Sequence, residues 1–186
     1  MISLPFRRTS QNATIEALYG MIVAQARLPA FYRGYGVPDT VSGRFDMIVL
    51  HLVLALRWLR QAPANVRPFG QQIFDLFCRD MDHNFREMGV GDLGVPKAMR
   101  RVAEAFYGRA GVYDAALDGD DDTALQAAVA RNVFGISEPP LGARRLAAYM
   151  REAARRLEAQ DPGAGAVRFP DPEAVSAADP RGDQVS

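Results

Sequence analysis

The residues that could do chemistry in this chain are few, because the sequence contains only two histidines and one cysteine. His83 and Glu87 stand four residues apart and Asp80 lies one turn earlier, so their side chains project from neighbouring positions of a predicted helix. Imidazole and carboxylate groups with this spacing can bind a metal ion. Ion pairs on a solvated helix face are the more common role of such residues. A small helical metal-binding protein or enzyme that uses Asp80, His83 and Glu87 is therefore the alternative hypothesis.

The other histidine and the cysteine fit structural roles. His51 interrupts an apolar run and Trp58 follows two turns later, so both are expected to form hydrogen bonds inside a core. Cys78, next to Phe77, is typical of a small buried side chain. The sequence has no phosphate-binding glycine loop, no paired cysteines for zinc and no serine elbow motif. It therefore indicates a binding protein and not an enzyme, with no catalytic residue, metal or cofactor expected.

The polar residues Asp80, His83 and Glu87 belong to a predicted pair of amphipathic helices joined by a glycine turn. Apolar residues recur at steps of three and four in both helices. They are Phe74, Phe77, Met81, Phe85 and Met88 in the first helix and Met99, Val102, Ala103, Phe106 and Tyr107 in the second. Gly89 suits the left-handed conformation that ends many helices, and Pro96 suits the first turn of the next one. The two stripes should face each other or a common third element.

The polar face of the first helix is predicted to be paired with itself. Oppositely charged or hydrogen-bonding residues recur there at a spacing of four. The expected pairs are Asp75 with Arg79, Asp82 with Arg86, and His83 with Glu87.

The elements that must position this hairpin are also predicted to be helices. A central core helix is expected from Gly43 to Arg60, apolar on nearly all sides, with Asp39, Thr40 or Ser42 as its N-cap. Its apolar run is too short and too interrupted to be one of the roughly 20-residue segments that cross a membrane. No stretch alternates as a strand would, so we predict an all-α, single-domain bundle of about six or seven helices around the central helix, with no sheet.

The remaining boundaries follow from glycine, proline and apolar spacing. We expect a flexible lead-in over residues 1–12, a helical domain over 13–160 and a mobile tail rich in proline and glycine over 161–186. The first helix is expected to begin at Thr14. The aromatic segment 31–38 is predicted to be an ordered loop, and the second hairpin helix is expected to end near Gly108.

The charge balance excludes one class of partner. Lysine plus arginine and aspartate plus glutamate each number 22, so the chain lacks the positive field of non-specific nucleic-acid binding. The first residues do not form a signal peptide, and a lone cysteine fits a reducing compartment. We therefore expect a cytoplasmic protein, with a peripheral contact at the cytoplasmic face of the inner membrane left open.

Several segments together resemble the ubiquinol–cytochrome c chaperone family. The stretch DLFCRDMDHNFREMGVGDLGVPKAMRR at residues 75–101, followed by FYGR and by YDAAL at 113–117, is similar to the core of that family. FYRGYGVPD at 31–39, Phe45-Asp-Met, Leu50-His-Leu and Trp58 also match. The resemblance extends over residues 13–157, and its most specific part is REMGVGDLGVPKAM at 86–99.

This resemblance implies an assembly chaperone that binds newly made cytochrome b and promotes assembly of the respiratory ubiquinol:cytochrome c oxidoreductase. It implies nascent or newly inserted cytochrome b as the partner, and no specific nucleic acid. Mitochondrial members work beside the ribosome with a small partner protein, and both contacts stay open for this chain. With no transit peptide in its sequence, the chain resembles a bacterial form.

The resemblance and the residue chemistry meet at the hairpin. Methionine side chains are flexible and polarizable, so they can repack around varied apolar partners, although core packing is the more common role of methionine and phenylalanine at this spacing. Arginines and Lys97 near the turn could form a basic rim for acidic loops or lipid headgroups. The predicted partner-binding residues are Asp80, Met81, Arg86, Glu87, Met88, Gly89, Asp92, Lys97, Met99, Arg100, Tyr107 and Arg109.

Overall fold

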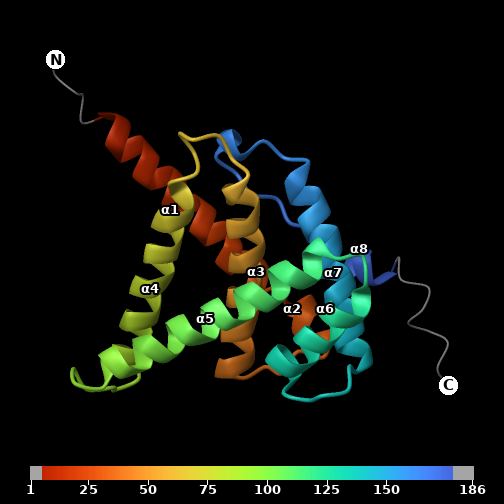
Figure 1. The fold of residues 1–186 in the computed structure, drawn as a ribbon. Coiled ribbons are helices and arrows are strands. Elements are labelled where there is room, and N and C mark those ends of the chain that lie inside the picture. The colour runs from red at the N-terminus through yellow and green to blue at the C-terminus, as the bar shows by residue number, and fades with distance from the viewer. Residues whose placement is uncertain (1–5, 178–186) are drawn as a thin grey trace.

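A computed structural model of the chain describes residues 6–177 (Figure 1). Every regular element in this range is helical and none is a strand, which confirms the predicted all-α fold. In order, the elements are α1 (Phe6–Ala26), α2 (Pro29–Arg33), α3 (Val41–Arg60), α4 (Phe69–Glu87), α5 (Val95–Asp118), α6 (Asp122–Val129), the π-helical turn η1 (Ala130–Phe134), α7 (Leu141–Glu158), the 3₁₀ turn η2 (Pro162–Ala164) and α8 (Pro172–Ala177). None of these helices is long and apolar enough to span a bilayer.

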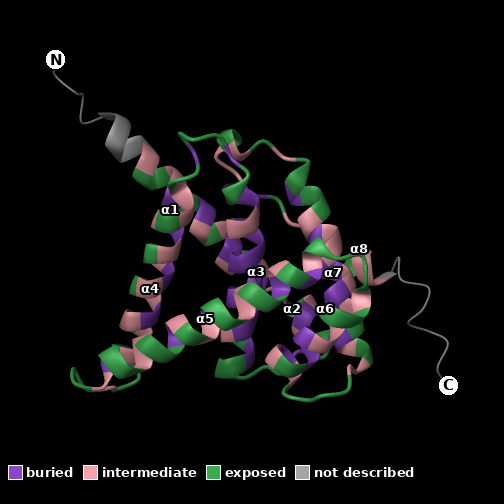
Figure 2. Cartoon of the chain, viewed as in Figure 1, coloured by how far each residue is buried: buried purple, intermediate pink, exposed green. Residues whose placement is uncertain are grey.

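The centre of the bundle is α3, as the sequence predicted. The helices α1, α4, α5 and α7 all contact it, and its residues from Met47 to Ala55 are buried on every side (Figures 1 and 2). Thr40 is its N-cap, because Thr40 Oγ1 accepts a hydrogen bond from the N–H of Gly43 at 3.1 Å. This enclosure explains the nearly continuous apolar sequence, since no face of the middle of α3 meets water.

The one histidine inside this core is hydrogen-bonded, as predicted. His51 Nδ1 lies 2.8 Å from the carbonyl oxygen of Met47, and its Nε2 lies 2.9 Å from the Tyr149 hydroxyl. The Gln25 amide donates to the same hydroxyl at 3.0 Å, so these bonds join α1, α3 and α7. Burial lowers the pKa of His51 to about 4, and the ring is therefore neutral at pH 7.

The hairpin helices α4 and α5 diverge from their turn, and both pack against α3 as the common third element (Figure 1). Gly89 has φ of 82°, so the predicted left-handed helix end is confirmed. The N–H of Val90 donates to the carbonyl of Phe85, and the N–H of Gly89 to that of Arg86, each at 3.0 Å. This pair of bonds is a Schellman motif, which satisfies carbonyls that the end of α4 would leave open.

The predicted end of the second hairpin helix near Gly108 is wrong. The helix α5 runs without a break through Gly108 and Gly111 to Asp118. Glycine lowers helix stability by only about 1 kcal/mol, and here the buried side chains of Tyr113 and Ala116 continue the packed stripe beyond it. Packing therefore overrides the two glycines.

The N-terminal helix is longer than predicted. The apolar spacing placed its start at Thr14, but α1 begins at Phe6. The first turns carry no apolar stripe, so periodicity could not detect them, yet no glycine or proline occurs between Phe6 and Gly20 to stop a helix. The predicted lead-in over residues 1–12 is thus helical from Phe6 onward, while residues 1–5 lie outside the described part of the chain.

Much of the predicted tail packs onto the bundle. Residues 162–177 include η2 and α8, and Val167 between them is buried. The Trp58 indole N–H, predicted to find an acceptor, donates to the carbonyl of Gln160 at 3.2 Å. The segment after residue 160 therefore packs on the bundle, where the Phe169 ring lies 5.1 Å from that of His51 on α3 and α8 contacts α7. Residues 178–186 lie outside the described range.

The aromatic segment 31–38 belongs to the core, partly as α2. Phe31 and Tyr35 are buried, and the Phe31 ring lies 4.9 Å from that of Tyr149. The Tyr35 hydroxyl donates to the carbonyl of Pro172 at 2.6 Å, which ties the segment to α8. A Cβ on Gly142 would come within 2.0 Å of the Tyr35 carbonyl oxygen, so the start of α7 needs glycine to approach this closely.

Candidate functional site

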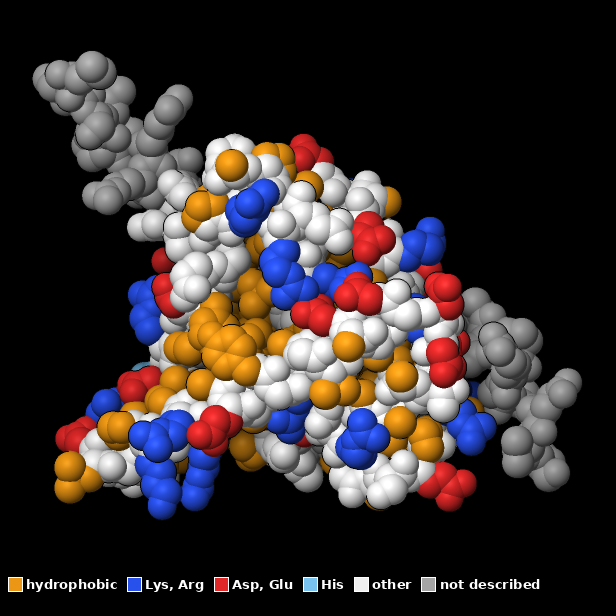
Figure 3. Space-filling view, in the orientation of Figure 1, with side chains coloured by type: hydrophobic (Ala, Val, Ile, Leu, Met, Phe, Trp, Pro, Cys, Tyr) orange, Lys and Arg blue, Asp and Glu red, His pale blue; other side chains and the backbone are white. Residues whose placement is uncertain are grey.

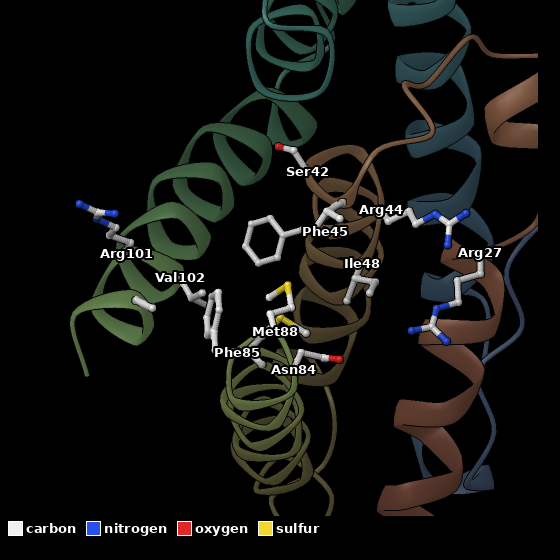
Figure 4. A pocket seen from close by; sticks show the side chains of 13 residues that line it. Arg27, Ser42, Arg44, Phe45, Ile48, Asn84, Phe85, Met88, Arg101 and Val102 are labelled. Carbon is white, nitrogen blue, oxygen red and sulfur yellow. The ribbon is translucent and has the colours of Figure 1, made fainter. Parts of the chain in front are cut away.

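An apolar groove of about 700 Å³ lies where the C-terminal end of α4, the first turns of α5 and the start of α3 come together (Figure 4). Most of its lining is hydrophobic. Its apolar side chains include Phe45, Ile48, Met81, Phe85, Met88 and Val102. The volume is within the range of pockets that hold ligands or partner side chains.

The groove is open because α4 and α5 diverge from the turn and no helix in residues 6–177 covers the gap beside the start of α3. Val41 and Met88 line it and remain 74% and 57% exposed. Large apolar side chains that stay in contact with water beside an apolar cavity mark an interaction site more often than a packing defect. Of the predicted partner-binding methionines, Met81 and Met88 line the groove, and Met81 is buried whereas Met88 is exposed.

Arginines border the groove on two sides. Figure 4 shows Arg27 and Arg44 on one side and Arg101 on the other. Arg44 forms an exposed ion pair with Asp39 at 2.8 Å. Within residues 11–176, neither Arg27 nor Arg101 has an acidic side chain at ion-pair distance. The border of the groove therefore carries more positive than negative charge.

A smaller opening of about 240 Å³ lies nearer the N-terminal end of α4, and Tyr107 borders it. The Tyr107 ring is mostly exposed and lies 5.8 Å from the ring of Phe74 and 5.3 Å from that of Phe106. In Figure 3 hydrophobic side chains reach the surface in the angle between α4 and α5, with Lys and Arg side chains gathered toward the hairpin turn. Tyr107 thus lies on the hairpin surface but outside the main groove.

The charges at the turn pair partly as predicted. Arg86 contacts both Asp82, at 2.8 Å, and Asp92, and His83 Nε2 lies 3.1 Å from Glu87. The third predicted pair does not form among the described contacts, because the Asp75 carboxylate accepts a hydrogen bond from Gln71 at 2.8 Å. Arg86, Glu87 and Asp92 are exposed. Because Arg86 pairs with Asp92 across the turn, this ion pair can stabilise the shape of the turn.

The first turns of α5 carry charges without partners. Lys97 and Arg100 are exposed, and no acidic side chain in the described range pairs with either. Positive charge is unfavourable at the N-terminal end of a helix, where the dipole is already positive, and α5 has no acidic residue in its first turn. These cations therefore do not stabilise the helix. Met99, between them, is half-buried and packs against the core.

Asp80 turns away from the groove and links helices. The Tyr19 hydroxyl donates to Asp80 Oδ2 at 2.8 Å, which joins α1 to α4. Burial, together with this carboxylate, raises the pKa of Tyr19 well above its usual range, so the phenol stays protonated as the donor. Asp80 therefore faces Tyr19 while His83 and Glu87 pair in solvent. In the part of the chain that the structure describes, no three His, Cys, Asp or Glu side chains are placed to hold a metal ion.

Arg109 also faces inward. Its guanidinium lies 2.7 Å from the buried carboxylate of Asp46 on α3, and 5.8 Å from the centre of the Phe45 ring. Burial raises the pKa of Asp46 to about 6, while the neighbouring Arg109 acts in the opposite direction. Arg109 therefore pairs with a buried carboxylate and lies against the Phe45 ring, so it is not part of an exposed basic rim.

The contribution of α3 to the groove was not predicted. Phe45 and Ile48 belong to a helix that is apolar on nearly all sides, a pattern that by itself indicates core. Arg27 and Arg44 lie outside the hairpin and reach the groove only through the fold. The one sequence signal was Phe45-Asp-Met, which is among the segments that resemble the family.

Comparisons with known proteins agree with that resemblance. A family model described as ubiquinol-cytochrome C chaperone matches residues 33–165, which include α3, α4 and α5. A solved structure, the crystal structure of the Cbp3 homolog from Brucella abortus, is similar to this chain with a TM-score of 0.81 and 40% sequence identity, over 90% of this chain and 96% of that chain. No match was found among curated proteins. On the family match and this structural similarity together, the chain belongs to the ubiquinol-cytochrome c chaperone family.

Proposed function

We propose that this chain is an assembly chaperone that binds newly made cytochrome b in the apolar groove and promotes its incorporation into the respiratory ubiquinol:cytochrome c oxidoreductase. The observation that carries the proposal is the groove, because it leaves Val41 and Met88 in water beside a cavity of about 700 Å³. All of its lining residues except Arg27 lie within the stretch that matches the family.

The groove suits a membrane protein that is not yet packed against its partners. Apolar segments of such a protein are exposed to water before assembly, and burying each methylene group is worth about 0.8 kcal/mol. Met81 and Met88 have flexible side chains that can adapt to several apolar shapes. Binding of this kind is reversible, so the segment can be released when its final partners bind it more tightly. The chain performs no covalent step in this account.

The turn and the start of α5 supply a second, polar contact. We assign Arg86, Lys97 and Arg100 to acidic loops of the client or to lipid headgroups, with Asp82 and Asp92 holding Arg86 in place. Leu93 at the tip is 99% exposed and lies beside these cations in sequence. An exposed leucine with neighbouring cations suits a shallow contact with anionic lipids, which are abundant in cytoplasmic leaflets. The proposed setting is the cytoplasmic face of the inner membrane, with nascent or newly inserted cytochrome b as the client.

Substitutions at the two exposed groove residues test this function without disturbing the core. Val41→Asp and Met88→Asp place a charge in the apolar groove, where desolvating it opposes binding of an apolar segment. Because both side chains are mostly exposed, the fold should be retained. We expect each variant to recover much less cytochrome b in co-purification and to assemble less oxidoreductase in cells that lack the parent protein.

Val112→Asp is the matched control. Val112 lies on α5, is 41% exposed and does not line the groove. This variant should behave as the parent protein does. If Val41→Asp and Met88→Asp both bind cytochrome b and support assembly as well as Val112→Asp does, the groove is not the client site.

A further inference from the structure

The apolar groove continues into a second pocket that is polar and basic. This pocket has a volume of about 390 Å³ and is lined by Arg27, Pro29, Tyr32, Arg33, Asp39 and Arg44. Arg27 and Arg44 line both cavities, so they mark the junction between the apolar and the polar space. In Figure 4 these two arginines stand together beside Ile48 at one end of the apolar lining.

The basic pocket has more positive than negative charge. Three arginines line it, and Asp39 is its only acidic lining residue, paired with Arg44 at 2.8 Å. In the described range neither Arg27 nor Arg33 has an ion-pair partner. The Tyr32 hydroxyl donates to the carbonyl of Ala26 at 2.9 Å, so it faces the backbone. Since both members of the Arg44–Asp39 pair are exposed, an incoming carboxylate can compete for Arg44 at little cost.

We propose that the groove binds an apolar helical segment that carries an acidic side chain at one end, and that Arg27 and Arg44 bind this carboxylate at the junction. The inference rests on the proposed function and specifies the chemistry of the client segment. A helix with an apolar face can lie in a groove between two helices, and guanidinium groups bind carboxylates in a directed, often bidentate way. The apolar part supplies affinity, and the carboxylate fixes the direction in which the segment lies.

The openness of the groove favours a peptide over a lipid of the same chemistry. A fatty acid also combines an apolar chain with a carboxylate, but small apolar ligands are held best in cavities that bury most of their surface. Val41 and Met88 leave this groove open along its side. A helix of roughly 10 Å diameter can lie across such an opening and keep its other face in water or against another protein.

Two synthetic helical peptides test the inference by fluorescence anisotropy. They share one apolar sequence and differ at a single terminal position, which is glutamate in one and glutamine in the other. The parent protein should bind the glutamate peptide about fivefold more tightly, as a partly exposed charge pair allows. Arg27→Gln and Arg44→Gln should each reduce this preference, because each should weaken binding of the glutamate peptide more than that of the glutamine peptide. Arg168→Gln, at an exposed site outside both pockets, should retain the full preference.

A second test reverses the charge at Arg27 and the charge on the peptide. Arg27→Glu should reverse the preference, so that a peptide with lysine at the same position binds more tightly than the glutamate peptide. Equal binding of the glutamate and glutamine peptides by the parent protein, or failure of the parent to bind either peptide, overturns the inference. So does a preference that survives in the Arg27→Gln/Arg44→Gln double variant.

Two further results show whether only this inference fails or whether the junction binds a fatty acid. If both peptides bind equally and Met88→Asp abolishes both, the groove binds apolar segments without reading their charge, and only the inference fails. If dodecanoate binds more tightly than the glutamate peptide and loses affinity in Arg27→Gln and Arg44→Gln, the junction is a fatty-acid site and the inference is wrong.

Discussion

Two sides of α3 carry the same kinds of residue but differ in how fully neighbouring helices cover them. On the side of α1 and α7, the apolar side chains are buried and the polar groups of His51 and Tyr149 bond to each other at 2.9 Å. On the side of α4 and α5, Phe45 and Met88 border an open groove. Apolar spacing alone is the same on both sides. What distinguishes the candidate binding side is that no further helix in the described part of the chain covers it.

The charges differ between these sides in the same way. On α7, Arg155 and Arg156 share Glu152, at 2.8 and 2.5 Å, and Arg151 pairs with Asp122 of α6, so these three arginines have acidic partners within the chain. Near the hairpin turn, Lys97 and Arg100 have no acidic partner among the described side chains. The number of arginines on a helix is therefore a poor guide to a binding surface, whereas charges without an internal partner are a better one.

The largest expected effect is on the closed side of α3. Leu52 is fully buried, so Leu52→Ala should lower the free energy of unfolding by about 2–5 kcal/mol through the cavity it leaves. Val41→Ala, on the same helix but in the groove, should change it by less than about 0.5 kcal/mol. Urea unfolding measures both. Similar losses from both substitutions would mean that the groove side is packed as tightly as the core.

Leu56 helps to place the border between the two sides. It is only half-buried, and it lines the smaller opening beside Tyr107. The loss from Leu56→Ala should therefore be smaller than that from Leu52→Ala.

His51 should make the closed side sensitive to acid. Its pKa is about 4 in the folded protein and about 6.5 when unfolded, so the unfolded state binds more protons between these values. Stability from this residue is complete above pH 6.5 and is lost as the pH falls toward 4, by about 1 kcal/mol at pH 5.5. Protonated Nε2 could no longer accept the Tyr149 hydrogen bond.

The variant His51→Phe isolates this effect from other titrating groups. At pH 7.5 it should be less stable than the parent by about 1–3 kcal/mol, because Tyr149 loses its acceptor. The difference should shrink at pH 5.5, since only the parent carries the histidine penalty. Urea unfolding of both proteins at the two pH values decides the matter, and a difference that stays constant would show that His51 does not titrate in this way.

Gly89 should show a smaller but local effect, because it sets the angle at which α4 and α5 diverge. Gly89→Val forces a β-branched residue to φ of 82° and should cost about 1–2 kcal/mol in thermal or urea unfolding. Gly91 is the control in the same turn, since its φ is not positive and a Cβ there would meet no neighbour. Equal stability of Gly89→Val and Gly91→Val would mean that the turn does not depend on the left-handed glycine.

The smallest expected effect on stability is at the charged turn, where function should change instead. Lys97→Glu should shift the melting temperature by less than about 2 °C, because Lys97 is exposed and unpaired in the described range. Arg86→Glu should also melt close to the parent, although it breaks the contacts to Asp82 and Asp92. Both should fail to support oxidoreductase assembly in cells. If either variant supports assembly as well as the parent does, the substituted residue does not contact the client and is only a solvent-exposed charge.

The sequence predicted the parts of the fold that depend on local pattern. The central helix, the left-handed Gly89 and the internal bonding of His51 all follow from spacing or from the chemistry of one residue type, and the structure confirms them. The break near Gly108 was wrong because tertiary packing of Tyr113 holds the helix through a glycine. The reason that α5 continues through Gly108 is a tertiary contact, which the local sequence does not show.

The candidate site was only partly predictable for a related reason. Met81 and Met88 were found because the hairpin is distinctive in sequence. Phe45 and Arg44 reach the groove from α3, and no pattern can tell which face of an all-round apolar helix its neighbours leave uncovered. Arg109 was assigned to the rim from its charge, yet it faces the buried carboxylate of Asp46. Charge type therefore gives the chemistry of a residue but not the direction in which it points.

Site-specific photocrosslinking during client synthesis tests the central claim most directly. A photoreactive amino acid at Met88 reports on the groove, and the same photoreactive amino acid at Val112 reports on an exposed position of α5 outside the groove. If the open side of α3 is the recognition surface, Met88 should crosslink to newly made cytochrome b and Val112 should not. Crosslinks from Val112 alone, or equal yields from both positions, would contradict the account.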